Sequence, residues 1–283
     1  MRKLPFLQLD VFSAVPFKGN PLAVIAEADG LGTEQMRAIA NWTNLSETTF
    51  LSKPRNAAAD YHVRIFTPTR ELPFAGHPTL GSCHAWLALG NKPKNDTIVQ
   101  ECAAGLVRIK RDGARLAFAA PPQIRSGAVD PELQGRIAAS LGIGREAIKA
   151  AQWVDNGPGW VAVLLGSRAE LLGLKQDSSL LPDQSLGVVA PWDNARDGNE
   201  AQFEVRAFMG RGGEDPVTGS LNASLAQWLI GAGIARPRYI ASQGTAIGRA
   251  GRVHVAQDGD TIWIGGDVTE CIAGSITIQG VYS

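Results

Sequence analysis

Two carboxylates and an imidazole stand in local sequences that suit proton transfer: Glu47, His77 and Asp215. Glu47 lies between the apolar residues Leu45 and Phe50. A carboxyl group held against apolar walls has its pKa raised toward the range in which it can take and return a proton. Most loop glutamates are simply solvated, but this setting predicts a general acid and base for a small molecule.

His77 and Asp215 each precede a proline, which suits the first turn of a helix because its missing N–H would have no partner there. We therefore expect His77 and Asp215 to be the N-caps of helices that open at Pro78 and Pro216. Most aspartates at this position only cap, whereas histidine is a poor cap and is better explained by a function. The free N–H groups and positive dipole end of each helix favour a carboxylate or phosphate ligand.

Short sequence matches indicate that the chain contains one unit twice. Three pairs of segments match at separations of 142, 138 and 139 positions: 63–66 with 205–208, 77–82 with 215–220, and 22–25 with 161–164. A duplicated unit related by a pseudo-twofold axis would turn the two helix starts toward each other. Such an arrangement could hold a small carboxylate while side chains on either side handle protons.

Length and charge favour a two-domain protein that binds a small molecule. The 283 residues suit two domains of about 140 residues. We expect them at 1–120 and 121–283, with the return of the last strand to the first domain left open. One long helix after each strand–loop corner predicts an α/β (α+β) fold. Lys+Arg and Asp+Glu are both 27, so the charge that attracts nucleic acid or anionic membranes is missing.

The cysteines and the apolar runs indicate a soluble protein in a reducing compartment. The three cysteines, Cys83, Cys102 and Cys271, form no CxxC pair and are typical of free thiols in a cytoplasmic protein. The N-terminus does not resemble a signal peptide, and no apolar run approaches the ~20 residues that span a bilayer. We expect a cytoplasmic protein with no membrane or nucleic-acid partner.

Motifs for nucleotides, metals and serine nucleophiles are missing from the sequence. The glycine-rich segment 210–213 lacks the third glycine of GxGxxG, and no GxxxxGK[ST], HExxH or GxSxG occurs. No cysteine pair joins a histidine at a zinc spacing. We therefore expect no bound nucleotide and no metal, and we interpret Ser220 as a hydrogen-bond donor at a helix start.

Several motifs occur in an order that resembles the PhzF-like (phenazine biosynthesis) isomerase family over nearly the whole length: Asn20-Pro21, Ser46-Glu47, 71–79, 214–220, Gln243-Gly244 and Gly248-Arg249. The resemblance implies a diaminopimelate-epimerase-like fold of two pseudo-symmetric domains. Each would be a curved sheet or barrel around a central helix, with the active site between them. It also implies a homodimer.

The resemblance further implies a cofactor-independent isomerase. In the best-understood members the substrate is trans-2,3-dihydro-3-hydroxyanthranilate, a small amino carboxylic acid. A glutamate at the position of Glu47 takes the proton from C3 and redelivers one to C1, and a ketone forms after tautomerisation. The other catalytic positions match His77 and Asp215, which would orient the substrate and assist proton movement. The positions expected to bind polar groups such as the carboxylate are Gly76, Gly219 and Ser220.

Two alternative functions stay open beside this isomerase. Related epimerases and racemases use a pair of cysteines at the two helix starts, whereas this chain has His77 and Asp215 there, and Cys83 lies about two turns inside a helix. Two-thiol racemisation is therefore not expected, but an epimerase or racemase with other bases is an alternative. A non-catalytic ligand-binding dimer is another. Leu221 departs from the family pattern, in which a small residue follows the serine, and puts the substrate's size in doubt.

Overall fold

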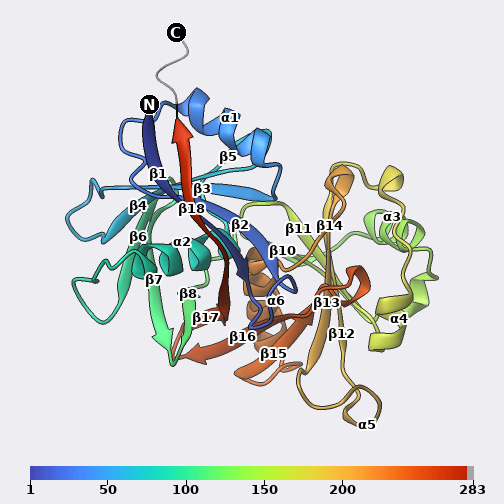
Figure 1. Ribbon diagram of the computed structural model, residues 1–283. Coiled ribbons are helices and arrows are strands. Elements are labelled where there is room, and N and C mark those ends of the chain that lie inside the picture. Colours follow the sequence, from blue (N-terminus) through green and yellow to red (C-terminus); the bar gives the residue numbers. More distant parts are fainter. Residues whose placement is uncertain (279–283) are drawn as a thin grey trace. The chain divides into compact units, whose positions relative to one another are not determined.

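The structure is a computed structural model that describes residues 1–278 and has the mixed α/β class expected from the sequence (Figure 1). It divides into two compact units. The first contains Met1–Ala119 and the segment from Gly265 onward, and the second contains Ala120–Ile264. Their status as independent folding domains stays a prediction.

The first unit is a sheet in the order β18-β1-β2-β3-β4-β6-β7-β8, with the short β5 beside the end of β4. The pairs β2–β3 and β4–β6 are parallel, and the others are antiparallel. Its elements are β1 (Arg2–Val11), β2 (Asn20–Ile25), α1 (Thr33–Thr43), β3 (Glu47–Ser52), β4 (Tyr61–Phe66), β5 (Glu71–Leu72), α2 (Gly76–Ala88), β6 (Ile98–Cys102), β7 (Gly105–Asp112), β8 (Arg115–Ala119) and β18 (Val268–Ile278).

The second unit repeats this order as β9-β10-β11-β12-β13-β15-β16, with the short β14 beside the end of β13. Here β11–β12 and β13–β15 are the parallel pairs. Its elements are β9 (Arg125–Ala128), α3 (Pro131–Leu141), β10 (Ala150–Asp155), β11 (Trp160–Leu164), α4 (Arg168–Gly173), β12 (Ser185–Pro191), α5 (Asn194–Asp197), β13 (Phe203–Met209), β14 (Glu214–Asp215), α6 (Gly219–Gly231), β15 (Arg238–Gln243), β16 (Gly251–Asp258) and β17 (Thr261–Gly266), which crosses the unit boundary.

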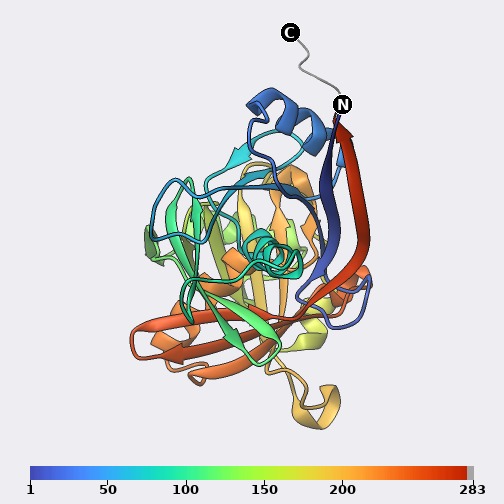
Figure 2. The same cartoon turned by 60° about the vertical axis from the view of Figure 1, so that its left-hand side comes forward.

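Each unit is organised around one largely buried helix. Figure 2 looks nearly along α2, with strands of the first unit around it. Both α2 and α6 have 13 residues, and most of those residues are buried. Consecutive buried residues, 76–83 in α2 and 221–226 in α6, cover every face of each helix, as expected for a helix enclosed by a sheet.

Glycine allows the closest helix–strand contacts in both units. An added Cβ at Gly81 of α2 would lie 2.4 Å from Leu22 Cδ2 on β2. In the second unit, an added Cβ at Gly187 of β12 would lie 2.5 Å from Leu221 Cδ1 on α6. Real Cβ atoms do not approach this closely, so each pair fixes how near its helix lies to the sheet.

The structure corrects the alignment of the two helix starts. The helices begin at Gly76 and Gly219, which are 143 positions apart rather than 138. A Glu-x-Pro-x-x-Gly pattern at 71–76 and at 214–219 has the same separation. The sequence match of 77–82 with 215–220 paired Pro78 with Pro216, whereas the structure pairs Pro216 with Pro73. Within residues 1–278, no helix has both the length and the apolar content needed to cross a bilayer.

Candidate functional site

The structure brings Glu47 and His77 together in the first unit. Glu47 is the first residue of β3 and lies opposite Leu22 of the parallel strand β2. His77 is the second residue of α2. Glu47 Oε2 lies 3.3 Å from His77 Nε2, and the two side chains are only 15% and 5% exposed. A carboxyl group and an imidazole therefore meet where solvent is largely excluded.

Burial keeps the His77 ring neutral. It lowers the pKa of His77 to about 3, although a hydrogen bond with the backbone of Pro21 partly opposes this shift. A neutral imidazole carries no charge, so its 3.3 Å approach to Glu47 is not a pair of opposite charges, and the geometry of the two atoms is not that of a hydrogen bond. His77 can thus orient the carboxyl group or relay a proton without adding positive charge beside it.

Asn20 lies on the other side of the His77 ring. Its Nδ2 atom is 3.4 Å from His77 Nδ1. The buried carboxylate of Asp10 accepts hydrogen bonds from the N–H groups of Lys18 and Gly19, at 2.7 and 2.8 Å, and so fixes the turn that leads into Asn20. A hydrogen-bond partner at one ring nitrogen of a histidine sets the orientation of the ring and decides which nitrogen carries the proton.

His77 is not the helix cap that the sequence suggested. Helix α2 begins at Gly76, and Ala75 occupies the N-cap position without a side-chain hydrogen bond. Proline is tolerated throughout the first turn because none of the first N–H groups has an intrahelical partner, so Pro78 can be the third residue rather than the first. This shift makes His77 the second residue of the first turn, where its side chain is buried.

Asp215 is not a helix cap either. It belongs to β14, and α6 begins four residues later at Gly219, with Thr218 as the N-cap. The Asp215 carboxylate accepts a short hydrogen bond from Thr218 Oγ1. The side chain of Gln243 binds both ends of the loop between them and takes the place of the expected capping bonds.

Gln243 uses its whole hydrogen-bonding capacity on this loop. Its Nε2 donates to Asp215 O at 3.2 Å and to Thr218 Oγ1 at 2.9 Å. Its Oε1 accepts from Thr218 N at 3.0 Å and from Asn222 Nδ2 at 2.8 Å. A fully buried amide satisfied at all four positions makes a rigid support for the Asp215 side chain.

Gly219 and Ser220 open α6 as its first and second residues. Ser220 Oγ accepts a hydrogen bond from Trp160 Nε1 at 3.1 Å, and Ser220 O accepts one from Asn156 Nδ2 at 2.9 Å. Because the hydroxyl oxygen already accepts, its own hydrogen is available to donate, which fits the sequence interpretation of Ser220 as a donor.

Leu221 does not crowd these helix starts. Its side chain is fully buried and fills the space beside Gly187 in the core of the second unit. A larger residue after the serine is accommodated by the missing side chain of Gly187, and the effect of Leu221 on substrate size stays an open question from the sequence.

The six predicted residues thus form two groups, each within its own unit: Glu47, Gly76 and His77 in the first, and Asp215, Gly219 and Ser220 in the second. Sequence reasoning used Asn20 and Gln243 only as parts of family motifs and did not single out Trp160 or Asn156. Alignment at 143 positions would have paired Ser220 with His77 and Gln243 with Gln100.

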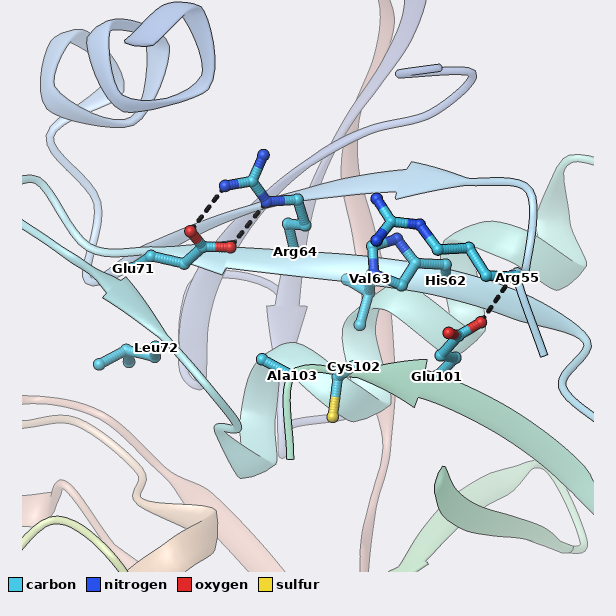
Figure 3. Close-up of a pocket in the computed structure, with 9 residues that line it drawn as sticks. All are labelled: Arg55, His62, Val63, Arg64, Glu71, Leu72, Glu101, Cys102 and Ala103. Atoms are coloured by element: carbon cyan, nitrogen blue, oxygen red, sulfur yellow. Dashed lines mark hydrogen bonds and ion pairs between the residues drawn. The ribbon is translucent and has the colours of Figure 1, made fainter. Parts of the chain in front are cut away.

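A separate pocket of about 360 Å³ lies in the first unit and contains none of the predicted site residues (Figure 3). It forms where β4 is flanked by β6 at its start and by β5 at its end. The pocket is lined by Arg55, His62, Val63, Arg64, Glu71, Leu72, Glu101, Cys102 and Ala103. Both acids already have partners: Glu71 binds the Arg64 guanidinium, and Glu101 binds the N–H groups of residues 55 and 56.

Comparisons with known proteins agree with this architecture. The family model described as phenazine biosynthesis-like protein matches residues 9–270. "Antisense-enhancing sequence 1" of Schizosaccharomyces pombe is 36% identical, over 97% of this chain and 99% of the relative. The trans-2,3-dihydro-3-hydroxyanthranilate isomerase of Pseudomonas fluorescens is 34% identical, over 90% of each chain.

Solved structures confirm the fold. A PhzF-family protein of Bacillus anthracis superposes with a TM-score of 0.83 at 21% identity, covering 98% of this chain and 100% of that one. A probable proline racemase from Agrobacterium radiobacter K84 gives a TM-score of 0.63 at 14% identity, covering 98% and 93%. The expected diaminopimelate-epimerase-like fold is therefore confirmed, and the chain is an isomerase-class member of the phenazine biosynthesis-like protein family.

Proposed function

We propose that this protein is a cofactor-independent isomerase that moves a proton on a small amino carboxylic acid of the trans-2,3-dihydro-3-hydroxyanthranilate type. Glu47 takes the proton from C3 and returns one to C1, the double bond shifts between them, and tautomerisation gives a ketone. Atoms and charge balance within the substrate, because one C–H bond breaks and another forms. The named isomerases among the relatives support the substrate class.

The contact between Glu47 and His77 carries this proposal. A carboxyl group that is 15% exposed, placed against a neutral imidazole at the start of a helix, can change protonation without a large rearrangement of solvent. His77 keeps the carboxyl oriented and assists the proton's movement. In this proposal Asp215 has the same supporting role, and Ser220 with the N–H groups of Gly76 and Gly219 binds polar groups such as the substrate carboxylate.

The thiols support a carboxylate rather than a cysteine as the base. Cys83 is fully buried in α2, and burial raises the pKa of its thiol to about 12. A thiol with such a pKa supplies almost no thiolate near neutral pH. Burial also raises the pKa of Cys102.

The decisive experiment is Glu47→Gln. This change keeps the size and polarity of the side chain and removes its ability to accept a proton. We expect kcat to fall at least about a thousandfold on dihydrohydroxyanthranilate, because positioned acid–base groups contribute about 10²–10⁴-fold. Binding of the non-reacting analogue 3-hydroxyanthranilate, followed by calorimetry, should change by less than about threefold.

Glu34→Gln is the matched control, since Glu34 is highly exposed on α1 and should leave turnover unchanged. Unchanged turnover in Glu47→Gln would refute the mechanism. Deuterium entering the α-carbon of an amino acid from solvent would indicate an epimerase or racemase. Binding of the analogue without conversion of any such acid would indicate a non-catalytic ligand-binding protein.

We also propose that the protein acts as a cytoplasmic homodimer.

A further inference from the structure

Among residues 1–278 of the first unit, strand β18 pairs with β1 on one side and with no strand on the other. Its residues Val268–Ile278 pair with β1, and Figure 2 shows the pair at the margin of the unit with β18 outermost. Ser275 lies opposite Pro5, whose carbonyl accepts a hydrogen bond at 3.0 Å from the N–H of Ala26, the residue directly after β2. The backbone of Pro5 therefore points to β2, so the N–H and C=O of Ser275 point away from β1.

The unpaired edge of β18 has the backbone groups and the uncharged residues that favour pairing with another strand. Because the direction alternates along a strand, Ala273 and Thr277 also direct their N–H and C=O groups outward. The eight residues 271–278 contain no charge and no proline, and Ile272 is 50% exposed. Proteins that stay monomeric protect such edges with lysine, proline or a covering segment, whereas an unprotected edge pairs with another strand.

We propose that a second copy of this chain pairs its own β18 antiparallel with this one, about a twofold axis at Gly274. This names the interface of the proposed homodimer and goes beyond it. At this register Ala273 lies opposite Ser275 of the second copy, and both residues direct their backbone groups into the new ladder. Ile272 then lies opposite Ile276 of the second copy, and Gly274 places no side chain at the axis.

Charge favours a second copy as the occupant. The single charged residue in β18 is Glu270, near its start, whereas the end of β18 lies beside the basic start of β1, where Lys3 is opposite Thr277. Antiparallel pairing brings the acidic end of each copy to the basic end of the other. The arrangement is isologous and closes, as a twofold dimer requires.

The first test changes one backbone donor. Ser275→Pro removes an N–H that faces the open side and takes no part in the β1 ladder, and proline is tolerated at such edge positions. Light scattering after gel filtration should show a dimer for the wild type and for Ser275→Ala, and at least tenfold weaker dimerisation for Ser275→Pro. Circular dichroism checks the fold, and Ile272→Lys tests the same edge through a side chain.

The outcomes separate the two proposals. A wild-type monomer at tens of micromolar overturns the homodimer and its interface together. A dimer that persists in both Ser275→Pro and Ile272→Lys overturns the interface alone. Turnover is measured on the same samples, so a loss of isomerase activity is recorded independently of the oligomeric state.

The second test fixes the register. In a Cys271→Ser background, Gly274→Cys should form an intermolecular disulfide, because residues opposite each other at the axis have Cα atoms about 4.5 Å apart. A Cβ at Gly274 meets no atom within 4 Å. Thr277→Cys is the control, since its two copies would be about 20 Å apart. Absence of the link at 274, or equal linking at 277, overturns the register.

Discussion

The corner of the first unit that carries His77 and the corner of the second that carries Ser220 are built from the same parts. In each, an arginine on a central strand binds a glutamate on the following short strand through two hydrogen bonds: Arg64 with Glu71, and Arg206 with Glu214. A proline and a glycine then lead into a 13-residue buried helix. The shared parts therefore fix the backbone at the helix start.

The side chains presented by this common backbone differ. The second helix residue is His77 in one unit and Ser220 in the other, and each contacts the first residue of a strand, Asn20 or Trp160. The parallel strand beside it opens with Glu47 in the first unit and with Ser185 in the second. The comparison teaches that the frame is shared by the two units, whereas a carboxyl group and an imidazole occupy these positions only in the first unit.

The two buried glutamines give the largest expected effect on stability. Gln243 makes four hydrogen bonds to the α6 entrance, while Gln100 makes two, donating to Thr79 Oγ1 and accepting from Tyr61 Oη. Gln243→Leu should lower the free energy of unfolding by about 4 kcal/mol and Gln100→Leu by about 2, because each buried polar group left without a partner costs about 1–3. Urea denaturation measures both, and equal losses would contradict the unequal support.

The arginine–glutamate pairs give the next largest effect on stability. The Arg206 side chain is 8% exposed and also donates to the carbonyls of Leu171 and Leu174, at 3.2 and 2.8 Å. Arg64 is 23% exposed. Arg206→Ala should cost about 3 kcal/mol, since it leaves a buried carboxylate unpaired, and Arg64→Ala about 1, since water can solvate Glu71. A larger loss for Arg64→Ala in the same denaturation assay would reverse this ranking.

Much of the frame could be predicted from the sequence, because duplication leaves matched segments. Helix α3, for example, runs from Pro131 to Leu141 with Asp130 as its cap, which is the structure that an Asp-Pro pattern followed by periodic apolar positions predicts. The same Asp-Pro pattern failed at Asp215. There a distant residue, Gln243, supplies the hydrogen bonds, and a local pattern cannot reveal a partner 28 positions away.

The candidate site was only partly predictable for a related reason. Apolar neighbours of Glu47 suggested a shielded carboxyl group, and the side chain is indeed largely buried. Its partner His77 lies 30 positions away on a helix, and only folding brings the two within 3.3 Å. The Trp160 contact to Ser220 had no sequence signal, since a tryptophan that starts a strand is more often a core residue.

The smallest expected effect on stability comes from the second residue of each helix, because His77 of α2 can titrate and Ser220 of α6 cannot. The pKa of His77 is about 3 in the folded protein, against about 6.5 for an ordinary histidine. Between these values the unfolded chain binds a proton that the folded chain excludes, so stability falls as the pH falls through this window. From pH 6.5 to pH 5 the His77 contribution should remove about 2 kcal/mol from the free energy of unfolding.

His77→Gln removes this contribution while keeping a polar side chain at the second position of α2. Burial also lowers the pKa of His62 and of His84, but both residues are present in the two proteins and their contributions cancel. The stability difference between wild type and variant should therefore shrink by about 2 kcal/mol between pH 6.5 and pH 5. Ser220→Ala should show no such dependence on pH, because a serine hydroxyl does not titrate in this range. Parallel curves for wild type and His77→Gln would mean that the His77 ring is protonated in the folded state, and Glu47 would then face a cation.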